Sequence, residues 1–596
     1  MLFFEFAKIF SKRQREEYYR MNLVKFGSCI ALTFCGNEGI MEKNVNGRDL
    51  IMDYRKLAER LIPGEYPALE TYEEKYPPRG LEKGAEVTRL APSPTGFIHL
   101  GNLFVAIANE RIAHQSGGIM YLRIEDTDLK RKVDGAVEAV KNALRYFDIK
   151  FDEGAEIDGD NTYAPWYQRQ RADIYRAYVK HLIEEGRAYP CFCTEDELSS
   201  LREEQTANKE ITGYYGKYAK CRNLSEEEIY RNLDAGKPYV IRLKSLGDPE
   251  NKIKFKDEIK GEITVTENDQ DVVILKSDGI PTYHFAHAID DHFMRTTLVL
   301  RGEEWLASLP IHLELFDALG FSRPRYGHNC SLMKQDGETR RKLSKRKDPE
   351  LSLEFYRQEG YFARAVKVYM LTLLNSNFEE WYLKNPDAPL ESFKFSAGKM
   401  SKSGTLFDLD KLNDISKNEL SKLSAEEMFD FLHEWAAEYG SESQKAYFID
   451  REKMLRVLTL CMGIGGKKRR KDFTTASQAM KFISIFFERT EREDKYRVDR
   501  ETKNAALEGF LRAYDFSDDA QVWFNKVKEL AANLGFAAEM KDYKANPEAY
   551  KGSVADVAEL LRIAATGRAN TPDLWTIMQI LGEEETRARI ERAIGE

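Results

Sequence analysis

The sequence predicts an α/β protein in which an interrupted parallel sheet is followed by an all-helical half. The first observation is the run EVTRLA at residues 86–91, which has the composition of a short buried strand. The next stretch, LGNLFVAIANERIAHQ, has helical spacing of its apolar residues, and Gly117–Gly118 ends it before a second strand, IMYLRIE. A strand, a helix and a strand in this order form the unit of a parallel nucleotide-binding sheet.

The second observation is that strand patterns return only after a long mixed segment. Residues 190–265 include a charged helix near Glu195–Gln205, and strands resume at DVVIL (271–275) and TTLVLRG (296–302). An insertion therefore splits the sheet domain. The third observation is that apolar residues keep helical spacing from Pro349 onward. This spacing is clearest in three stretches: Leu406–Leu420, Met428–Tyr439 and Asp556–Ala565.

Length and composition limit the classes of protein. A chain of 596 residues is too long for one core, so we expect three or four domains. The hydrophobic content of 42% fits a soluble globular protein, and no apolar run reaches the ~18–20 residues of a membrane span. A net charge of −9 argues against a general nucleic-acid coat, so any RNA contact must come from local basic patches. Seven unevenly spaced cysteines do not predict a disulfide framework, which favours the cytoplasm.

Residues 1–51 have no helical or strand period of useful length. Met52 begins MDYRKLAERLIPGEYP, which has the composition of the start of a globular protein. We therefore predict that residues 1–51 are an N-terminal extension, either a disordered arm or the product of an upstream start site.

The segment from Arg89 to Asn102, RLAPSPTGFIHLGN, carries the first candidate site. It combines a strand end, a tight turn and a helix start, whose free N–H groups and dipole favour an anion. His99 at the helix start can donate a hydrogen bond to a phosphate oxygen, and Gly101 lets a nucleotide approach the backbone. Outside such a frame, a histidine at a helix start is usually structural.

The second candidate site is the basic segment RRKLSKRK at residues 340–347, which follows the turn at Asp336–Gly337. A loop of this composition can fold over a triphosphate and neutralise charge as pyrophosphate leaves. The competing interpretation is a solvated basic loop on the surface.

Five segments together resemble one family. They are RLAPSPTGFIHLGN (89–102), LRIEDTD (122–128), PTYHFAHAIDDH (281–292), LRGEEW (300–305) and KLSKRKD (342–348). In these segments the chain resembles the bacterial-type glutamyl-tRNA synthetases, a branch of the class I aminoacyl-tRNA synthetases. The first and last segments correspond to the family's HIGH and KMSKS signatures. The resemblance covers residues 65–420 well and the helical region more loosely.

The resemblance implies a Rossmann-like parallel sheet domain with an inserted acceptor-binding domain, followed by an all-α anticodon-binding region. After residues 1–51, the expected parts are the first half of the catalytic domain (52–190), the inserted acceptor-stem-binding domain (191–270), the second half of the catalytic domain (271–330), a stem-contact region with the KLSKR loop (331–410) and the helical anticodon-binding domain (411–596).

The resemblance also implies a reaction. L-glutamate is activated with ATP and Mg²⁺ to glutamyl-adenylate and then transferred to the 3′-terminal adenosine of tRNA(Glu) by a cytoplasmic monomer. The sequence leaves open whether tRNA(Gln) is charged as well. The implied catalytic residues are His99, Lys342 and Lys345. The implied ATP site also includes Gly101, Asn102, Ser344 and Arg346.

An acidic substrate needs a cationic pocket, because an unpaired buried carboxylate is costly and the arginine fork matches its geometry. The resemblance implies that seven residues surround the glutamate: Arg89, Ala91, Ser93, Glu125, Tyr283, His287 and Arg301. Two of them have a simpler interpretation, in which Arg301 pairs with Glu303 or Glu304 and Glu125 is an ordinary surface charge. At His287 relatives often carry a different polar residue.

A second lysine-rich segment competes for the ATP site. Lys399–Ser403 is spelled KMSKS and matches the family's signature more literally than Lys342–Arg346 does. It lies beyond the predicted end of the α/β domain, whereas the family's ATP loop follows closely on the RGEEW strand. We therefore predict that ATP binds at Lys342–Arg346.

Four other classes share part of this pattern. A nucleotidylyltransferase needs neither the insertion nor a long helical half, and a glutamyl-queuosine tRNA enzyme lacks the helical half. Glutaminyl-tRNA synthetases usually have a PPEPNG-like loop where this chain has APSPTG (91–96). A tRNA-binding paralogue without activity is expected to lose the ATP groups, whereas His99 and Lys345 are both present.

The densest basic cluster of the helical half is the run KKRRK after Gly465–Gly466. It either grips the tRNA backbone or is a solvated face. The residues proposed for tRNA are Lys467, Lys468, Arg469 and Arg470.

A cysteine cluster matches part of a zinc site that some relatives have. Cys191, Cys193 and Cys221 supply three ligands, but a structural zinc site has four. Arg222 and Asn223 follow where a Cys or His would complete the site, and Tyr218 is an unusual substitute. We therefore expect no bound zinc.

Overall fold

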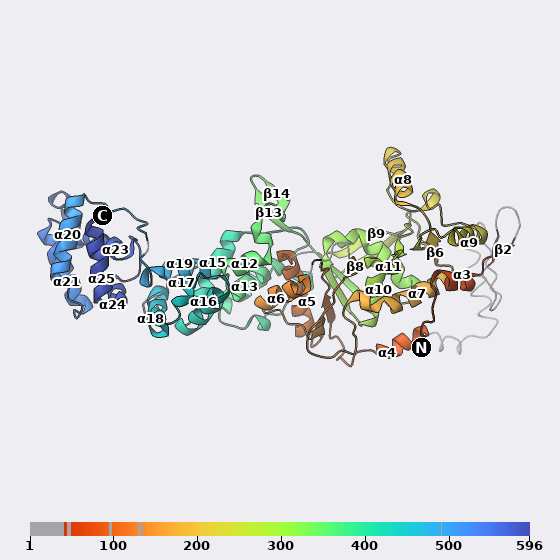
Figure 1. The fold of residues 1–596 in the computed structure, drawn as a ribbon, viewed down its shortest axis with the longest axis horizontal. Helices are drawn as coiled ribbons and strands as arrows, with labels where there is room; N and C mark the ends of the chain where they lie inside the picture. Colours follow the sequence, from red (N-terminus) through yellow and green to blue (C-terminus); the bar gives the residue numbers. More distant parts are fainter. Residues whose placement is uncertain are drawn as a thin grey trace.

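The computed structural model describes residues 41–43, 49–94, 98–128, 133, 135–489 and 491–595. The molecule is elongated, with the sheet domain and its insertion toward one end and the helical half toward the other (Figure 1). Most of the predicted extension at 1–51 lies outside the described residues, and its nature stays a prediction. Its last part includes the antiparallel strands β1 (Met41–Lys43) and β2 (Asp49–Ile51). Among the described helices, none combines the length and apolar character needed to cross a membrane.

A parallel sheet forms the centre of the catalytic half, as predicted. Its strands are β3 (Val87–Leu90), β4 (Ile119–Leu122), β5 (Glu153–Gly154), β11 (Leu298–Gly302) and β12 (Arg325–Asn329). β3, β4 and β5 pair in parallel, and β11 pairs in parallel with β12. The two groups meet where the Thr297 N–H donates to the Val87 carbonyl at 3.0 Å. The order β5-β4-β3-β11-β12 reverses direction beside β3, and such a switch point is where ligands bind in open α/β sheets.

Helix α5 (Leu100–Gln115) follows β3 and has the predicted bounds. Its N-cap is His99, whose backbone N–H donates to Asn102 Oδ1 at 3.1 Å. It ends before Gly117, whose φ of +72° places it in the left-handed region that favours glycine. Both faces of this helix are largely buried, between the sheet and helix α13 (Ala363–Leu374). This packing fixes the helix start, and therefore His99, at the carboxyl end of β3.

The insertion has its own antiparallel sheet. Strands β6 (Ala188–Cys191), β7 (Val240–Leu243) and β10 (Val273–Leu275) pair in the order β10-β7-β6. The segment beginning at 271 was predicted to return to the catalytic sheet, but β10 pairs with β7, so the insertion's sheet extends past residue 270. The predicted charged helix is α8 (Glu195–Ala207), and α9 (Glu226–Asp234) follows it.

A hairpin of the insertion packs against the catalytic sheet. It consists of β8 (Lys252–Asp257) and β9 (Gly261–Thr266). Its apolar side chains, among them Phe255 and Ile263, pack on Val299 of β11 and Tyr326 of β12. Because this hairpin spans from the insertion to the sheet, it brings the turn after Asp257 close to the carboxyl end of β11.

The segment from 331 to 410 contains a second hairpin, of β13 (Leu332–Asp336) and β14 (Thr339–Lys342), which projects from the body in Figure 1. β13 also pairs in parallel with β15 (Thr405–Leu406). The predicted helix Leu406–Leu420 was therefore wrong at its start. Helix α15 (Leu409–Leu420) begins after Asp408, whose carboxylate accepts the N–H groups of the first turn.

The remaining helices fall into two groups along the chain. In the catalytic half they are α3 (Tyr54–Leu61), α4 (Leu69–Lys75), α6 (Ala136–Tyr146), α7 (Ala172–Glu184), α10 (Tyr283–Phe293) and α11 (Leu309–Ala318). Beyond the β13–β14 hairpin they are α12 (Leu353–Glu359), α14 (Phe378–Lys384), α16 (Ala425–Tyr439), α17 (Glu442–Ala446), α18 (Arg451–Met462), α19 (Ala476–Ile483), α20 (Arg500–Ala513), α21 (Ala520–Asn533), α22 (Met540–Ala545), α23 (Val554–Thr566), α24 (Leu574–Leu581) and α25 (Glu583–Gly595).

The predicted helical domain at 411–596 has two separate hydrophobic cores. One includes Met428 and Leu458, from helices α16 and α18, and the other includes Leu507 and Leu561, from helices α20 and α23. The predicted stretches Met428–Tyr439 and Asp556–Ala565 lie within α16 and α23.

Candidate active site

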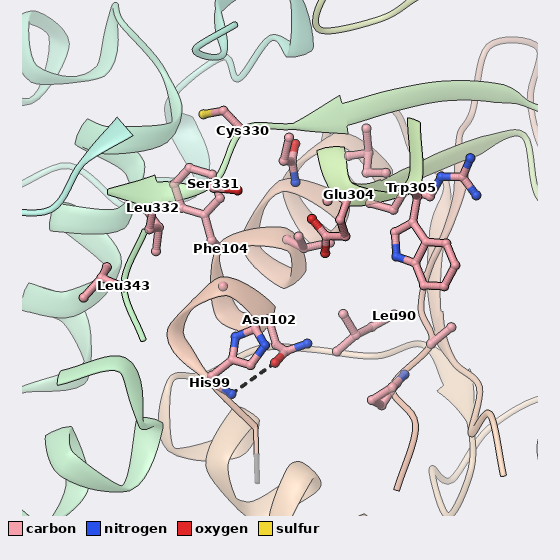
Figure 2. A pocket seen from close by; sticks show the side chains of 18 of the residues that line it. Leu90, His99, Asn102, Phe104, Glu304, Trp305, Cys330, Ser331, Leu332 and Leu343 are labelled. Carbon is pink, nitrogen blue, oxygen red and sulfur yellow. Dashed lines mark hydrogen bonds between the residues drawn. The ribbon is translucent and has the colours of Figure 1, made fainter. Parts of the chain in front are cut away.

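A cavity of about 380 Å³ opens at the carboxyl ends of β3 and β11. Figure 2 shows His99 and Asn102 on one side of it and Glu304 and Trp305 on another. Most of the predicted site residues line this one cavity, from both halves of the sheet and from the basic loop: Arg89, Ala91, His99, Gly101, Asn102, Glu125, Tyr283, Arg301, Lys342 and Lys345. The two candidate sites of the sequence are therefore parts of one site.

Four predicted residues do not line the cavity. Ser93 is exposed, Ser344 and Arg346 lie outside the lining, and His287 is fully buried behind Tyr283, with the two rings stacked at 5.8 Å between centroids. The prediction that His287 contacts the substrate is therefore not supported by its position. Its Nδ1 lies 2.8 Å from Asp291, and its Nε2 lies 2.9 Å from the Tyr326 hydroxyl.

Two lining residues were missed as individual candidates, although both belong to the LRGEEW segment. Trp305 lies 4.3 Å from the ring of Tyr283, measured between centroids, and closes one wall of the cavity. Glu304 folds back over the strand end so closely that a Cβ at Gly302 would lie 2.3 Å from its carboxylate. A side chain at position 302 would displace this flexible carboxylate from its place at the strand end.

Two lysines, Lys345 and Lys342, and the carboxylate of Glu304 act on the imidazole of His99. Burial lowers the pKa of its imidazole, and Lys345 and then Lys342 lower it further, so the ring is neutral near pH 7. Its Nδ1 is buried without a hydrogen-bond partner among the described residues. The ring also lies 3.0 Å from where a Cβ of residue 101 would be, so glycine there leaves the ring its space. A neutral imidazole beside two lysines can donate a hydrogen bond to a phosphate oxygen.

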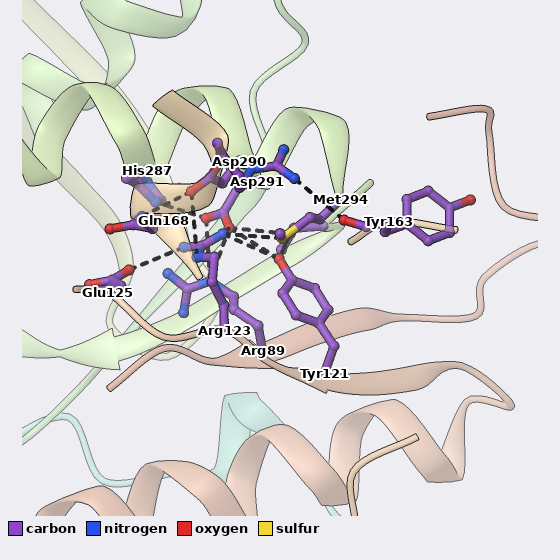
Figure 3. Close-up of polar contacts among 12 residues, drawn as sticks. Arg89, Tyr121, Arg123, Glu125, Tyr163, Gln168, His287, Asp290, Asp291 and Met294 are labelled. Atoms are coloured by element: carbon purple, nitrogen blue, oxygen red, sulfur yellow. Dashed lines mark hydrogen bonds and ion pairs between the residues drawn. The ribbon is translucent and has the colours of Figure 1, made fainter. Parts of the chain in front are cut away.

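A buried ionic network lies beside the cavity (Figure 3). The carboxylate of Asp291 accepts from Arg123 Nη1 at 2.6 Å and from Arg89 Nε at 3.3 Å. Burial acts to raise the pKa of Asp291, but the two guanidinium groups hold it well below its usual range. Asp291 therefore keeps Arg89 charged and fixed in position at the cavity wall.

Glu125 sits at the edge of the same network. Its Oε1 accepts from Arg123 Nη2 at 3.2 Å, and the side chain is almost completely buried. Burial raises the pKa of Glu125 to about 7, against the lowering effects of Arg123 and Arg89. Glu125 is therefore a buried carboxyl rather than an ordinary surface charge.

Arg301 is a buried cation without a carboxylate partner in the part of the chain that the structure describes. Its Nε donates to His328 Nε2 at 3.0 Å, and its Nη1 lies 2.9 Å from His312 Nδ1. Its Nη2 is buried without a hydrogen-bond partner among the described residues. Of the two carboxylates considered from the sequence, Glu303 pairs with Lys260 at 2.8 Å, and Glu304 forms no ion pair with Arg301. The simpler interpretation of Arg301 is therefore wrong.

The competing KMSKS segment lies away from the cavity lining. Lys402 is exposed, and its carbonyl accepts from Lys260 Nζ at 3.0 Å, beside the turn of the β8–β9 hairpin. Lys342 and Lys345, in contrast, lie at the open rim of the cavity.

One buried carboxylate, that of Asp348, holds the basic loop through hydrogen bonds and ion pairs. Asp348 accepts from Arg341 Nη2 at 2.8 Å and from the Ser344 N–H at 2.8 Å, and it lies 3.3 Å from Lys334 Nζ. These contacts close the loop around Lys345.

The three cysteines converge, as their spacing suggested. Cys193 Sγ lies 3.6 Å from Cys221 Sγ, and all three sulfur atoms lie within 4.8 Å of one another. The nearest further donor is the Tyr214 hydroxyl, at 3.3 Å from Cys193 Sγ; Tyr218, which the sequence suggested, bonds to Glu210 instead. Three thiols and a phenol differ from the usual Cys and His ligands of structural zinc, and the absence of zinc stays a prediction.

The basic cluster of the helical half lies in the loop between α18 and α19. Lys467, Lys468 and Arg469 are exposed, and Arg470 pairs with Asp472 at 2.7 Å. The loop presents its charges to solvent, which is compatible with both interpretations made from the sequence.

Comparison with known proteins agrees with this site. A family model described as "tRNA synthetases class I (E and Q), catalytic domain" matches residues 86–414, and one described as "Anticodon binding domain" matches residues 469–594. The chain belongs to these class I tRNA synthetases.

Individual relatives narrow the comparison. A glutamate--tRNA ligase of Acetivibrio thermocellus is 52% identical over 548 residues, which are 91% of this chain and 100% of the relative. One of Clostridium perfringens (strain 13) is 50% identical over 550 residues, or 90% and 100% of the two chains. A crystal structure of a glutamate tRNA ligase from Elizabethkingia meningosepticum, in complex with its amino acid, has a TM-score of 0.69 and 30% identity; the match covers 86% of this chain and 99% of that one.

Proposed function

We infer that this chain is a glutamate--tRNA ligase, which uses ATP to activate L-glutamate and transfers it to the 3′ end of tRNA(Glu). Two glutamate--tRNA ligases match 91% and 90% of the chain, with sequence identities of 52% and 50%. The main structural support for glutamate as the substrate is Arg301. Its guanidinium is buried at the cavity wall and lacks a carboxylate partner among the described residues. A ligand carboxylate supplies the missing charge.

The first step joins glutamate to ATP. A substrate α-carboxylate oxygen attacks the α-phosphorus, the bond from that phosphorus to the bridging oxygen breaks, and pyrophosphate leaves. No nucleophile of the protein is needed, so catalysis rests on positioning and charge. We propose that His99 donates to a phosphate oxygen and that Lys342 and Lys345 neutralise the departing pyrophosphate. Mg²⁺ enters with ATP and supplies further neutralisation.

The second step transfers the amino acid. The terminal ribose hydroxyl of the tRNA attacks the carbonyl carbon of glutamyl-adenylate, and AMP leaves. The helical half carries the anticodon-binding match. We propose that this half binds anticodon nucleotides, that the insertion binds the acceptor end, and that the ligase acts as a cytoplasmic monomer. Charging of tRNA(Gln) remains an alternative within the same reaction.

We propose that the two ends of glutamate are held by opposite charges. Arg301, together with Arg89, binds the side-chain carboxylate, and Tyr283 forms the wall between them. The ionised form of Glu125 binds the α-ammonium group.

The reaction is tested by ATP–pyrophosphate exchange with each amino acid. Among the amino acids, we expect only glutamate to support exchange, and we expect this exchange to require tRNA. Exchange supported by glutamine but not by glutamate would contradict the assignment, and exchange without any tRNA would contradict the expectation, implied by the family resemblance, that tRNA binds before activation.

The role of Glu125 predicts a pH dependence of glutamate binding. Its pKa of about 7 in the free protein means that the carboxyl is half protonated near neutral pH. Since only the carboxylate pairs with an ammonium group, glutamate affinity should fall below pH 7 by up to about tenfold per pH unit. Calorimetric titration with glutamate in the absence of ATP measures this effect and avoids the titration of the nucleotide.

The matched control for this titration is Glu125→Gln. This variant should bind glutamate more weakly at pH 8 and lose the dependence between pH 5.5 and 8, a range chosen around the pKa of about 7. The same pH dependence in the wild-type protein and the variant would show that another group titrates. For stability the sign is opposite to that of binding: the raised pKa means that Glu125 stabilises the fold at low pH, and this contribution is lost as the pH rises through 7.

A further inference from the structure

Arg301 is held by neutral acceptors on two sides. An arginine N–H only donates, so His328 Nε2 and His312 Nδ1, which receive these bonds at 3.0 and 2.9 Å, must be the unprotonated nitrogens of their rings. Both histidines are completely buried. The guanidinium also lies over the ring of Tyr326, at 4.8 Å from its centroid. Its Nε and one Nη1 donor are thus committed to the protein, whereas Nη2 has no hydrogen-bond partner among the described residues.

The opposite nitrogen of each ring fixes its tautomer. His328 Nδ1–H donates to Asp257 Oδ2 at 2.5 Å. His312 Nε2–H donates to His284 Nδ1 at 2.9 Å. Two chains of hydrogen bonds therefore start at Arg301, and their donors run through His328 to Asp257 and through His312 to His284.

Asp257 is fixed in turn by the hairpin of the insertion. Its Oδ1 accepts from the N–H groups of Ile259 and Lys260, at 2.9 and 2.8 Å, in the turn between β8 and β9. The insertion is thus connected to Arg301 through one carboxylate and one imidazole.

We propose that His312 and His328 are positioning residues that hold the guanidinium of Arg301 for a substrate carboxylate, with Asp257 of the insertion fixing the tautomer of His328. This inference rests on the proposed function, because it assumes that Arg301 binds glutamate. Glu304 lines the same cavity, and no ion pair joins it to Arg301 among the described residues. The two imidazoles neutralise no charge, yet they hold the guanidinium away from that internal partner, and its charge stays available to the ligand.

The same arrangement bears on the choice of substrate. Arg301 lines the cavity and keeps Nη2 unpaired while its other donors are committed, and the N–H groups of Nη2 match the acceptor oxygens of a carboxylate. The amide nitrogen of glutamine would place its own N–H groups against those donors. Loosening Arg301 should therefore weaken glutamate binding more than glutamine binding, and the preference between them should fall.

The test replaces each histidine with glutamine and with asparagine, and the substitution expected to be better tolerated differs between His328 and His312. A glutamine side chain carries its amide at the level of imidazole Nε2, and an asparagine side chain carries its amide at the level of Nδ1. His328→Gln and His312→Asn therefore keep the acceptor for Arg301, whereas His328→Asn and His312→Gln remove it. Each pair has the same chemistry, so a general disturbance of the fold cannot reproduce an order that reverses between the two positions.

The measurement is tRNA-dependent ATP–pyrophosphate exchange with varied glutamate, varied ATP and glutamine as competitor. We expect the acceptor-keeping variants to retain the KM for glutamate within about threefold, and the acceptor-removing variants to raise it by about 10- to 100-fold. The KM for ATP should stay unchanged, and the preference for glutamate over glutamine should fall with the rise in KM. The proposal would be overturned if the same substitution, Gln or Asn, were better tolerated at both positions. It would also be overturned if the KM values for glutamate and ATP changed equally, or if neither changed.

Arg301→Lys separates this inference from the proposed function. If that variant leaves the KM for glutamate unchanged, Arg301 is not in the glutamate site and the proposed function of this cavity fails. If it raises the KM while the histidine pairs do not reverse in order, Arg301 binds glutamate without these positioning residues, and only the inference fails. Thermal unfolding of all five variants serves as the check that each is folded.

Discussion

Lys345→Ala should reduce glutamate activation by a factor on the order of 10²–10³, because it removes a positive charge from the rim of the cavity. Such a group stabilises charge that develops as pyrophosphate leaves, so the loss should appear in kcat more than in the KM for glutamate. ATP–pyrophosphate exchange in the presence of tRNA measures it.

Lys402→Ala is the matched control for this prediction. It removes the same side chain from the segment with the more literal KMSKS spelling, which lies outside the cavity lining, and should leave exchange nearly unchanged. A large loss with Lys402→Ala and none with Lys345→Ala would reverse the assignment of the ATP loop.

Asp291→Ala should destabilise the catalytic domain by about 3–5 kcal/mol, since it leaves two buried guanidinium groups without their shared carboxylate. Asp291 accepts from Arg123 and Arg89 and is also bonded to His287, and all four side chains are buried. The midpoint of thermal unfolding of the purified protein should fall, and glutamate should recover little of the loss.

The control for Asp291 is Asp317→Ala, which removes the partner of Arg323 in an exposed ion pair. Such surface pairs contribute about 0–1 kcal/mol, so this variant should unfold close to the wild-type temperature. Equal destabilisation by the two substitutions would mean that the buried network adds no more than a surface pair does.

Sequence patterns predicted the elements that are long or strongly apolar. Helix α5 has the expected bounds, and β3, β4 and β11 lie within the expected stretches, because each combines buried residues with a glycine or turn that ends it. The short strands β10 and β15 are a different case. β10 has three residues and β15 has two, which is too short for a pattern of alternating apolar residues to be recognised. Their pairing also depends on strands elsewhere in the chain.

The same division holds for the site. His99 and Lys345 lie in segments whose local pattern suggested a site, Arg89 was assigned by the family resemblance, and the structure brings all three to one cavity. His287 was predicted among the residues around glutamate, and the structure places it fully buried outside the cavity lining, because tertiary packing decides which way a residue on a helix turns. The contact of Tyr214 with the cysteines depends on the path of a loop, and no local pattern distinguishes it from Tyr218.

The contact between β3 and β11 determines when the catalytic domain can complete its folding during synthesis. Val87 and Thr297 are 210 residues apart, so a nascent chain has no complete catalytic centre until synthesis has passed β11 and β12. Closing so large a loop is slow unless the intervening chain is already compact, and the insertion's own sheet shortens the distance that must be searched. Fragments released before β11 is made lack the part of the cavity wall that β11 and the residues after it supply, so we expect them to be inactive.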